Sequence, residues 1–450
     1  MTVNLLFNNF LEINKKNYQY RFASLNLNSQ ILKNQIMKKL ILSLSILALF
    51  AVGCTSTDET VTQPPAPTPL GSGEITGDFT ANKTFIKGNY TLKGMVKIPA
   101  GITVTFDAGS TITCTVATGE NGLVVLNGGK LIMNGTATEP IVLTESSKVP
   151  GSWAGILMYG DAPIINSATA ALPQTATSED GLALPYGGAN LTHNGGTLRY
   201  VRVEYAGRVI TQNNKEHNGF SFYAVGSGTI LENLVSYKGN DDGFEFYGGN
   251  VSLKNSISYG NTDDAFDWQD GWSGQDNTNW FAYQTGKANY GLEVEAKSVN
   301  NSFFPRVTNI TLKRAAGTIT ESLSEIQLDA FQFKKEGNGD YSNIVVDGFK
   351  TYTYTDPVSG TTISRNGGVV QVLDANTNTN QVAGGKVKIT NIKITNCDNN
   401  FISGAASFTT SASTFNPTTN WNPTTTATGA SLTAGAWATV DGVNLLANLN

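Results

Sequence analysis

Residues 231–249 read LENLVSYKGNDDGFEFYGG and residues 253–271 read LKNSISYGNTDDAFDWQDG, so one motif stands twice in succession. The second copy begins 22 residues after the first, and the offset stays constant along the motif. A fixed period of this size predicts a solenoid, in which each copy is one structural unit that buries its apolar face by stacking on its neighbour. The recurring positions are, in the first copy, Asn233, Tyr237, Asp241, Asp242, Phe244 and Glu245.

Fainter copies on both sides of this pair predict successive rungs of one β-sheet. Alternation with period two directs one set of side chains inward and the other outward. The expected inward set is Phe220, Phe222, Phe244, Phe246, Phe266, Trp268, Phe331 and Phe333. The expected outward row is Ser221, Glu245, Asp267, Glu293, Gln332 and Gln371. A second recurring phrase predicts a hydrogen-bonded stack of asparagines at a tight corner, formed by Asn233, Asn255, Asn309, Asn343 and Asn391.

The composition favours an all-β fold. The 450 residues include 47 glycines and only 14% charged residues, and no amphipathic helix of useful length stands out after residue 75. Together with the repeat, this predicts an all-β solenoid over residues 76–401, and the family resemblance given below implies that it is a right-handed parallel β-helix. Residues 161–196 form a long insertion, which is expected to be a functional lid or a disordered excursion. Residues 402–450 are expected to cover the open C-terminal end, since bare strand edges invite aggregation.

The N-terminal region matches a bacterial lipoprotein signal. Two lysines follow Met37, an apolar run covers residues 40–50, and small residues lead to Cys54. Residues 1–36 are then an extension ahead of the true start, residues 37–53 a signal peptide, and residues 54–75 a lipidated cysteine and a Thr/Pro-rich tether. Cys54 is expected to carry the acyl chains, palmitate among them, and to hold the protein to the outer membrane. The alternative is a transmembrane anchor, for which the apolar run is short.

The expected mature chain is acidic. Residues 1–53 hold six of the 30 basic and one of the 35 acidic residues, which leaves 24 basic and 34 acidic residues and a formal charge of −10. This balance argues against nucleic acid or an anionic bilayer surface as a partner, and suits cations or neutral polar ligands. We expect a monomer.

Acidic residues concentrate around the duplicated motif. Glu245, Asp267 and Glu293 should stack about 4.8 Å apart, where like charges repel unless a cation bridges them or one takes up a proton. Calcium prefers such oxygen ligands. The predicted calcium ligands are Asp241, Asp242, Glu245, Asp263, Asp264 and Asp267. Alternatively the paired aspartates cap turns by accepting backbone N–H bonds, which would explain little for Glu245 and Asp267.

Aromatic residues stand beside this acidic row in the segment 271–290. Exposed rings next to polar groups commonly bind sugars, so we predict that Trp272, Trp280 and Tyr283 contact a saccharide. The alternative is that the segment folds these rings back onto the solenoid.

Four phrases, GSWAGI, LRYVRVEYAG, NDDGFEFYGG and TDDAFDWQDGWSG, resemble the pectin-lyase-like superfamily over residues 90–400. Within it they are similar to a group of Bacteroidetes surface lipoproteins, which implies the β-helix but no activity. Asp58 and Glu59 resemble the acidic surface-export signal of such lipoproteins, which implies a surface-exposed protein; an ordinary solvated linker is the alternative.

Asp263, Asp264 and Asp267 resemble the calcium-binding strand of family nine pectate lyases, which implies that they are metal ligands. Those lyases place a catalytic lysine on the following coil, where this chain has Glu293. Asn261, Thr262 and Asp263 resemble the catalytic strand of polygalacturonases, but the other strands of that family have no counterpart here. The catalytic candidates are thus Asp263, Asp267 and Glu293, since glycosidases also use carboxylate pairs about 5 to 9.5 Å apart.

Three functions follow as hypotheses. The first is a calcium-binding, polysaccharide-binding protein of the cell envelope. The second is a calcium-dependent polysaccharide lyase or glycoside hydrolase. The third is a structural adhesin or surface scaffold.

Overall fold

The computed structural model describes residues 71–115, 120–210, 215–298, 304–320 and 327–450. The predicted N-terminal extension, signal peptide, lipidated cysteine and most of the tether lie outside these ranges. Within them, no helix has the length and apolarity needed to cross a membrane. Residues 69–450 form one compact unit, to which all the strands below belong.

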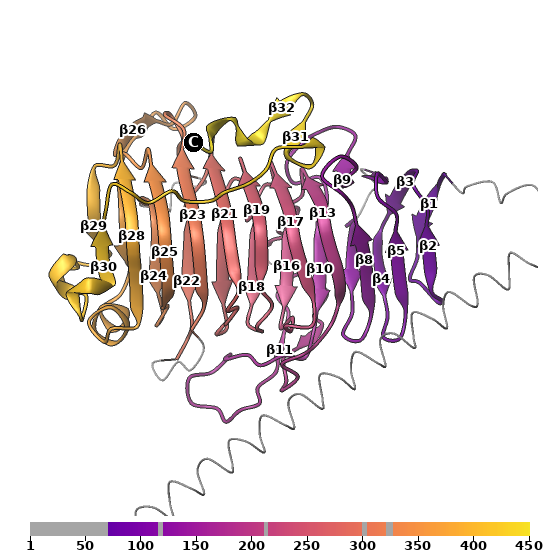
Figure 1. The fold of residues 1–450 in the computed structure, drawn as a ribbon, viewed down its shortest axis with the longest axis horizontal. Helices are drawn as coiled ribbons and strands as arrows, with labels where there is room; N and C mark the ends of the chain where they lie inside the picture. The colour runs from indigo at the N-terminus through magenta and orange to yellow at the C-terminus, as the bar shows by residue number, and fades with distance from the viewer. Residues whose placement is uncertain (1–70, 116–119, 211–214, 299–303, 321–326) are drawn as a thin grey trace, which may run out of the picture. The chain divides into compact units, whose positions relative to one another are not determined.

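Two long sheets build this unit, and successive coils add strands to both (Figure 1). The 15-stranded sheet contains β1 (Ser72–Thr76), β2 (Lys83–Phe85), β3 (Asn89–Lys93), β5 (Thr103–Phe106), β6 (Thr111–Cys114), β8 (Lys130–Asn134), β9 (Ile141–Glu145), β13 (Gly196–Glu204), β17 (Ile230–Tyr237), β19 (Leu253–Tyr259), β21 (Asn277–Gln284), β23 (Arg306–Arg314), β25 (Gly339–Asp347), β28 (Val387–Thr395) and β30 (Trp421–Pro423). The 11-stranded sheet contains β4 (Met95–Ile98), β7 (Gly122–Val125), β10 (Ile156–Tyr159), β16 (Phe220–Tyr223), β18 (Phe244–Tyr247), β20 (Phe266–Gln269), β22 (Leu292–Glu295), β24 (Gln327–Lys334), β26 (Tyr352–Thr355), β27 (Thr362–Val372) and β29 (Asn399–Ser403).

The strands of these two sheets pair in parallel, except that β26 is antiparallel to β27. Smaller elements are the hairpins β11 (Ala176–Thr177) with β12 (Pro185–Tyr186), β14 (Val209–Ile210) with β15 (Lys215–Glu216), and β31 (Thr439–Val440) with β32 (Val443–Asn444), and the short helices η1 (Thr377–Val382), η2 (Ala412–Thr414), η3 (Thr418–Asn420), η4 (Ala436–Ala438) and η5 (Leu445–Asn448). The predicted all-β parallel β-helix is confirmed. It begins at β1, slightly before residue 76, and β30 adds a strand from within the predicted tail.

Strand β13 marks a change in the cross-section of the solenoid. Its residues 196–199 pair with β8 and its residues 201–203 pair with β9. Tyr200, between the two halves, has a positive φ of 49°. Two separate strands on the N-terminal side are therefore continued by one bent strand on the C-terminal side.

Asparagine occupies this bend in the coils that follow. Its side chain tolerates the left-handed conformation better than most residues do, and φ lies between 51° and 59° at Asn233, Asn255, Asn279, Asn309, Asn343 and Asn391. Asn279 donates to Asn255 over 2.9 Å, Asn343 to Asn309 over 2.7 Å, and Asn391 to Asn343 over 3.3 Å. The predicted asparagine stack is confirmed in two runs, Asn255 with Asn279 and Asn309 with Asn343 and Asn391, while Asn309 donates to Thr278 between them. Asn279 is an additional member that the sequence phrase missed, because a polar residue begins its copy of the phrase.

The inward row forms the core between the sheets. All eight side chains predicted to face inward are at most 1% exposed. The register pairs Phe220 with Phe244 and Phe244 with Phe266, and the ring centroids of these pairs lie 5.0 and 5.3 Å apart. The repeat thus stabilises the fold through continuous aromatic stacks.

The segment 271–290, expected to be a loop, contains strand β21. Trp272 and Trp280 are 1% and 0% exposed and stack on Phe246 and Phe266 in the core. Each indole N–H donates to a backbone carbonyl, that of Val251 or Leu253. The prediction that these two rings bind a sugar is wrong, because the segment folds them inward, as the alternative held. Tyr283 lies on the other sheet and stacks on Tyr259.

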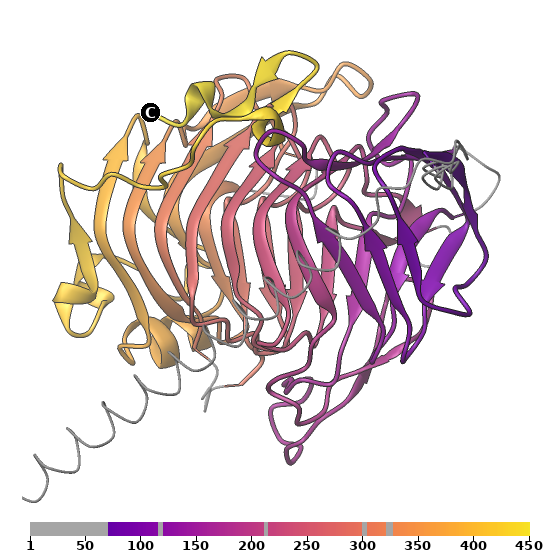
Figure 2. The same ribbon diagram turned by 45° about the vertical axis from the view of Figure 1, so that its right-hand side comes forward.

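The C-terminal tail does more than cover the open end. Trp421 and Phe415 pack on Phe401 at the last coil, as predicted for a cap. The chain then runs back along the outer face of the 15-stranded sheet as far as β13 (Figures 1 and 2). There Trp437 packs edge-on against Tyr200, and the tail covers the outward side chains Val235, Ile257 and Phe281.

Candidate functional site

The paired aspartates stand at the corners that lead into β18 and β20, and their second members form a hydrogen-bonded ladder. Asp242 accepts the backbone N–H of Asp264 over 2.8 Å. Asp264 in turn accepts the backbone N–H of Tyr290 over 2.6 Å. The turn-capping interpretation therefore holds for Asp242 and Asp264. It accounts for one oxygen of each carboxylate and leaves the second oxygen of Asp242 for other contacts.

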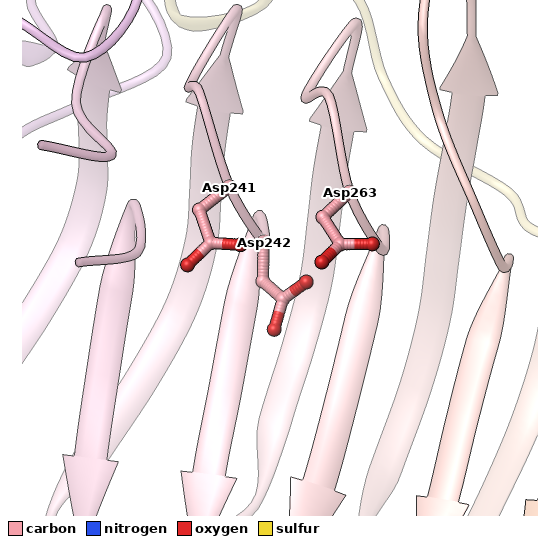
Figure 3. A group of neighbouring side chains, drawn as sticks. All are labelled: Asp241, Asp242 and Asp263. Atoms are coloured by element: carbon pink, nitrogen blue, oxygen red, sulfur yellow. The ribbon is translucent and has the colours of Figure 1, made fainter. Parts of the chain in front are cut away.

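Five of the six predicted metal ligands converge in two overlapping triads. One contains Asp241, Asp242 and Asp263, and the other contains Asp242, Glu245 and Asp267; within each, one oxygen of every carboxylate lies within 4.8 Å of the others. Figure 3 shows the first triad, with side chains from the corners of two neighbouring coils on the same side of the solenoid. Asp264 belongs to neither triad.

The two carboxylates at the centres of the strands have different partners. Glu245 and Asp267 are register neighbours in β18 and β20. Glu245 accepts hydrogen bonds from Asn218 over 2.6 Å, from Gln269 over 3.0 Å and from the Tyr247 hydroxyl. Asp267 Oδ1 is buried and has no hydrogen-bond partner within the described residues. A buried carboxylate oxygen without a partner is costly, so this atom points to a ligand.

Burial and mutual repulsion disfavour the charged forms of these groups. Burial raises the pKa of Asp242 well above its usual range, and Asp241 and Asp264 raise it further. Burial also raises the pKa of Asp267, with Glu245 adding to the rise and the Lys334 ammonium opposing it. The pKa of Glu245 is raised by burial, against the hydrogen bond from Tyr247. Uptake of a proton or binding of a cation therefore relieves the unfavourable charge of the cluster.

These side chains line a groove of about 420 Å³ on the outer face of the 11-stranded sheet. We call it the carboxylate groove. It is lined by nine carboxylates and four lysines, a formal excess of five negative charges. The lining residues are Glu179, Lys215, Glu216, Asp241, Asp242, Glu245, Tyr247, Asp263, Asp267, Gln269, Glu293, Glu295, Lys297, Lys334 and Lys335.

Three of the lysines lie at the C-terminal side of the groove and pair with carboxylates. Lys334 pairs with Glu293, and Lys335 Nζ lies 2.7 Å from Glu295. Lys297 lies 2.5 Å from Asp270. Sequence reasoning missed these lysines, although Lys334 continues the period-two alternation of β24 by one outward position beyond Gln332. The position of Glu293, where the resemblance implies a lysine, thus receives an ammonium group from the next coil.

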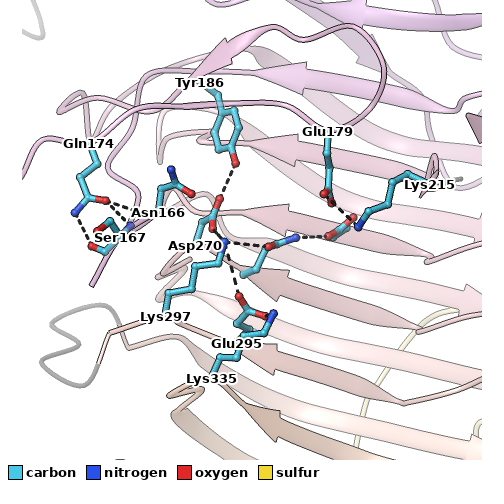
Figure 4. A network of polar contacts seen from close by, with 12 residues as sticks. Asn166, Ser167, Gln174, Glu179, Tyr186, Lys215, Asp270, Glu295, Lys297 and Lys335 are labelled. Atoms are coloured by element: carbon cyan, nitrogen blue, oxygen red, sulfur yellow. Dashed lines mark hydrogen bonds and ion pairs between the residues drawn. The ribbon is translucent and has the colours of Figure 1, made fainter. Parts of the chain in front are cut away.

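The insertion 161–196 forms one wall of this region (Figure 4). The Tyr186 hydroxyl donates to Asp270 over 2.6 Å. Tyr186 and Ile164 also pack against the outward stack of Tyr223 and Tyr247. The insertion therefore lies beside the groove, held by this hydrogen bond, by bonds from the Tyr159 hydroxyl to Ser178 and Asp180, and by the apolar contact. The lid interpretation stays a prediction.

The residues of the two triads fit a divalent cation of the calcium type. The donors are all carboxylate oxygens, which calcium prefers, and Asp267 Oδ1 lacks any other partner among the described residues. A bound cation would neutralise charges that burial and repulsion otherwise disfavour. Asp241, Asp242, Glu245, Asp263 and Asp267 would hold it.

A family model described as a pectate-lyase like beta helix domain matches residues 73–440 of the chain. The matched range contains every residue of the carboxylate groove. A search among curated proteins finds no match.

Proposed function

The chain belongs to the pectate-lyase-like β-helix family, and from this premise we propose that it binds a divalent cation, calcium by preference, and with it an acidic polysaccharide in the carboxylate groove. The observation that carries the proposal is the buried Oδ1 of Asp267, which has no hydrogen-bond partner in the described part of the chain and lies within a triad of converging carboxylates. A cation there would offer its remaining coordination positions to the sugar carboxylates and hydroxyls.

The charges of the groove support an acidic rather than a neutral saccharide. Lys297, Lys334 and Lys335 stand beside the carboxylate triads, on the coils of β22 and β24. A uronate carboxylate could pair with an ammonium group on this side while the cation holds it on the other. A neutral sugar would offer no charge to either the cation or the ammonium groups.

A calorimetric calcium titration tests the cation site. We expect saturable binding by the wild type and loss of binding in Asp267→Asn. Asp276→Asn is the matched control, because Asp276 is an exposed carboxylate that pairs with Lys254 outside the groove. Equal calcium binding by the wild type and Asp267→Asn would contradict the proposal.

A second titration tests the saccharide. Oligogalacturonides are the probe, and we expect binding in calcium that is lost in a chelator. Neutral oligosaccharides of the same length are the control and should not bind. Equal binding with and without calcium would contradict the claim that the cation holds the saccharide. The lysines would then remain as its contacts.

Eliminative cleavage of the polysaccharide is a second candidate function, and the position of Lys334 favours it. The Lys334 side chain lies in the groove, pairs with Glu293 and is near enough to Asp267 to lower its pKa. In such a reaction a base removes the proton beside the sugar carboxylate, and the glycosidic C–O bond breaks to leave an unsaturated product. The base would be the Lys334 amine, which takes up this proton, while the departing sugar oxygen receives a proton from solvent.

Product absorbance in the ultraviolet, which reports the new C=C bond, tests cleavage. If the protein is a lyase, Lys334→Ala should lose activity by at least a hundredfold, in the range for removal of a general base. Lys254→Ala, at a lysine that pairs with Asp276 outside the groove, should keep activity within a few-fold. No absorbance change with any acidic glycan would leave binding as the function.

The proposal also places the protein at the surface of the bacterial outer membrane, anchored through a lipidated Cys54. The lipoprotein signal before Cys54 supports this part. Labelling of growing cells with a palmitate analogue should mark the wild type and not Cys54→Ser. Protease treatment of intact cells then tests outward exposure. We expect the protease to cleave the tether.

A further inference from the structure

The outward row of the 11-stranded sheet is less deeply buried over one short stretch. Its exposed fraction is 1% at Ser221, 6% at Glu245 and 9% at Asp267, and it falls again to 3% at Gln332 and 0% at Gln371. Glu293, between Asp267 and Gln332 in the register, keeps a partly exposed side chain. This less buried stretch, formed by Glu245, Asp267 and Glu293, therefore covers about three coils, or about 10 Å at the rung spacing of parallel strands.

Two segments meet across the sheet at the N-terminal end of this stretch. The insertion leaves the C-terminal end of β10, and the β14–β15 hairpin precedes the N-terminal end of β16. Because β10 and β16 are parallel neighbours, the two segments leave the sheet at opposite ends of these strands. Glu179 of the insertion and Lys215 of the hairpin form an ion pair of 3.2 Å between them, and both line the carboxylate groove. Figure 4 shows the two side chains facing each other.

The bridge lies at the β16 end of this stretch, where the row is buried. Ser221 of β16, which is 1% exposed, is the register neighbour of Glu245. On the same side, Tyr186 and Ile164 of the insertion cover Tyr223 and Tyr247. A polymer lying along the solenoid axis could not continue past this point without displacing the insertion.

We infer that the carboxylate groove takes the end of an acidic saccharide chain, or a short oligosaccharide, and not the interior of a polymer, with the Glu179–Lys215 bridge as the closure. This inference rests on the proposed function and specifies how the ligand lies in the same site. A closed end also sets a direction: the chain terminus meets the bridge, and the rest of the saccharide points away from it within the groove, toward Lys334.

The binding stoichiometry of long chains tests this inference. A size series of oligogalacturonides, from trimer to hexamer, and a long polygalacturonate fraction of known mean length are titrated calorimetrically in calcium. We expect one protein per chain at every length, and dissociation constants per chain within twofold of one another from trimer upward. Several proteins per long chain, in numbers that grow with chain length, would overturn the inference while leaving the proposed function intact. Absence of binding at every length would overturn both.

A variant that removes the bridge gives a second readout. The pair is exposed, with 53% and 44% of the two side chains accessible, so it contributes little to folding stability and can be removed safely. In Glu179→Ala/Lys215→Ala we expect more than one protein per long chain, where the wild type binds one. Lys130→Ala, an exposed lysine of β8 away from the groove, should behave as the wild type. A bridge variant that still binds one protein per long chain would show that the bridge is not the closure.

Discussion

At the scale of single residues, Asp267 has a carboxylate that is unfavourable for folding but suited to binding a cation. Its carboxylate stands mid-strand beside Glu245, is largely withdrawn from water, and leaves Oδ1 without a partner among the described residues. A buried charge in this situation lowers stability unless a ligand compensates for it. The same property that makes the position unfavourable without metal makes it selective for a cation.

Asp267→Asn should therefore stabilise the metal-free protein. In a chelator at neutral pH we expect the free energy of unfolding to rise by about 1–3 kcal/mol, the range for relieving an unsatisfied buried group. Urea unfolding measures the change, with Asp276→Asn as the exposed control. A metal-free variant less stable than the wild type would mean that Asp267 makes a favourable contact in the absence of the cation.

The raised pKa values also predict the pH dependence of stability. For Asp242, Asp264 and Asp267 the pKa is higher in the folded than in the unfolded state. Their stabilising contribution is thus complete below the unfolded carboxyl pKa of about 4 and is lost as pH rises through the folded pKa. The metal-free protein should be more stable at pH 5 than at pH 8, and calcium should remove most of this difference.

The comparison with Asp267→Asn isolates the cluster from other titrating groups. Burial lowers the pKa of His217 to about 4, so its contribution has the opposite sign and is lost as pH falls. Asp329, raised to about 8 by burial, titrates in the same direction as the cluster but outside it. Urea midpoints at both pH values should show a flatter profile in the variant, and an unchanged profile would contradict the assignment.

At the scale of the structural elements, the bent strand is the unit that repeats. Its bend requires a positive φ, which asparagine supplies while its amide bonds to the coils above and below. Asn309, with φ of 59°, donates to Thr278 and accepts from Asn343. One residue type thus satisfies both the backbone conformation and the stacking of coils.

Asn309→Ala and Asn309→Gly separate these two contributions. Alanine loses the hydrogen bonds and meets left-handed strain of about 1–2 kcal/mol, whereas glycine loses only the bonds, since it adopts positive φ readily. We expect both variants to be destabilised, the alanine variant by about 1–2 kcal/mol more. Equal urea midpoints for the two variants would show that strain at the bend is negligible.

The elements also show what sequence could reveal and what it could not. The 22-residue offset predicted the register of β17 with β19 and of β18 with β20, because one period fixes every stacked position. It could not place Trp272 and Trp280, since their segment departs from the repeat and ring burial depends on the coil shape. Lys334 continues the alternation one outward position beyond Gln332, but spacing does not show that its side chain reaches back to Glu293 on the preceding coil.

At the scale of the whole molecule, the returning tail joins coils that are distant in sequence. Arg202 of β13 donates to the backbone carbonyls of Ala436 and Thr439, over 2.9 Å each. Ser431 and Ala430 bond to Asn279 and Thr311. Sequence reasoning predicted a cap at the last coil but not this return path, because the tail carries no periodicity that would reveal the surface it covers.

Trp437→Ala tests the contribution of this path. Trp437 is 2% exposed and packs among the outward apolar side chains of the 15-stranded sheet, so its truncation should cost about 3–5 kcal/mol. Val443→Ala, at a tail residue that is 47% exposed, should stay within about 0.5 kcal/mol of the wild type. Thermal and urea unfolding measure both, and similar midpoints for the two variants would contradict a structural role for the tail.

The pairing of Glu245 with Asp267 across neighbouring rungs has a consequence for how such a site can arise. The two residues occupy the same place in the two copies of the motif, and so do Asp242 and Asp264. Copying one segment of the gene therefore delivers a second set of acids at rung distance in a single event, together with the repulsion that only protons or a cation can relieve. A lineage that extends this solenoid by tandem duplication gains candidate ion sites as a by-product of growing longer.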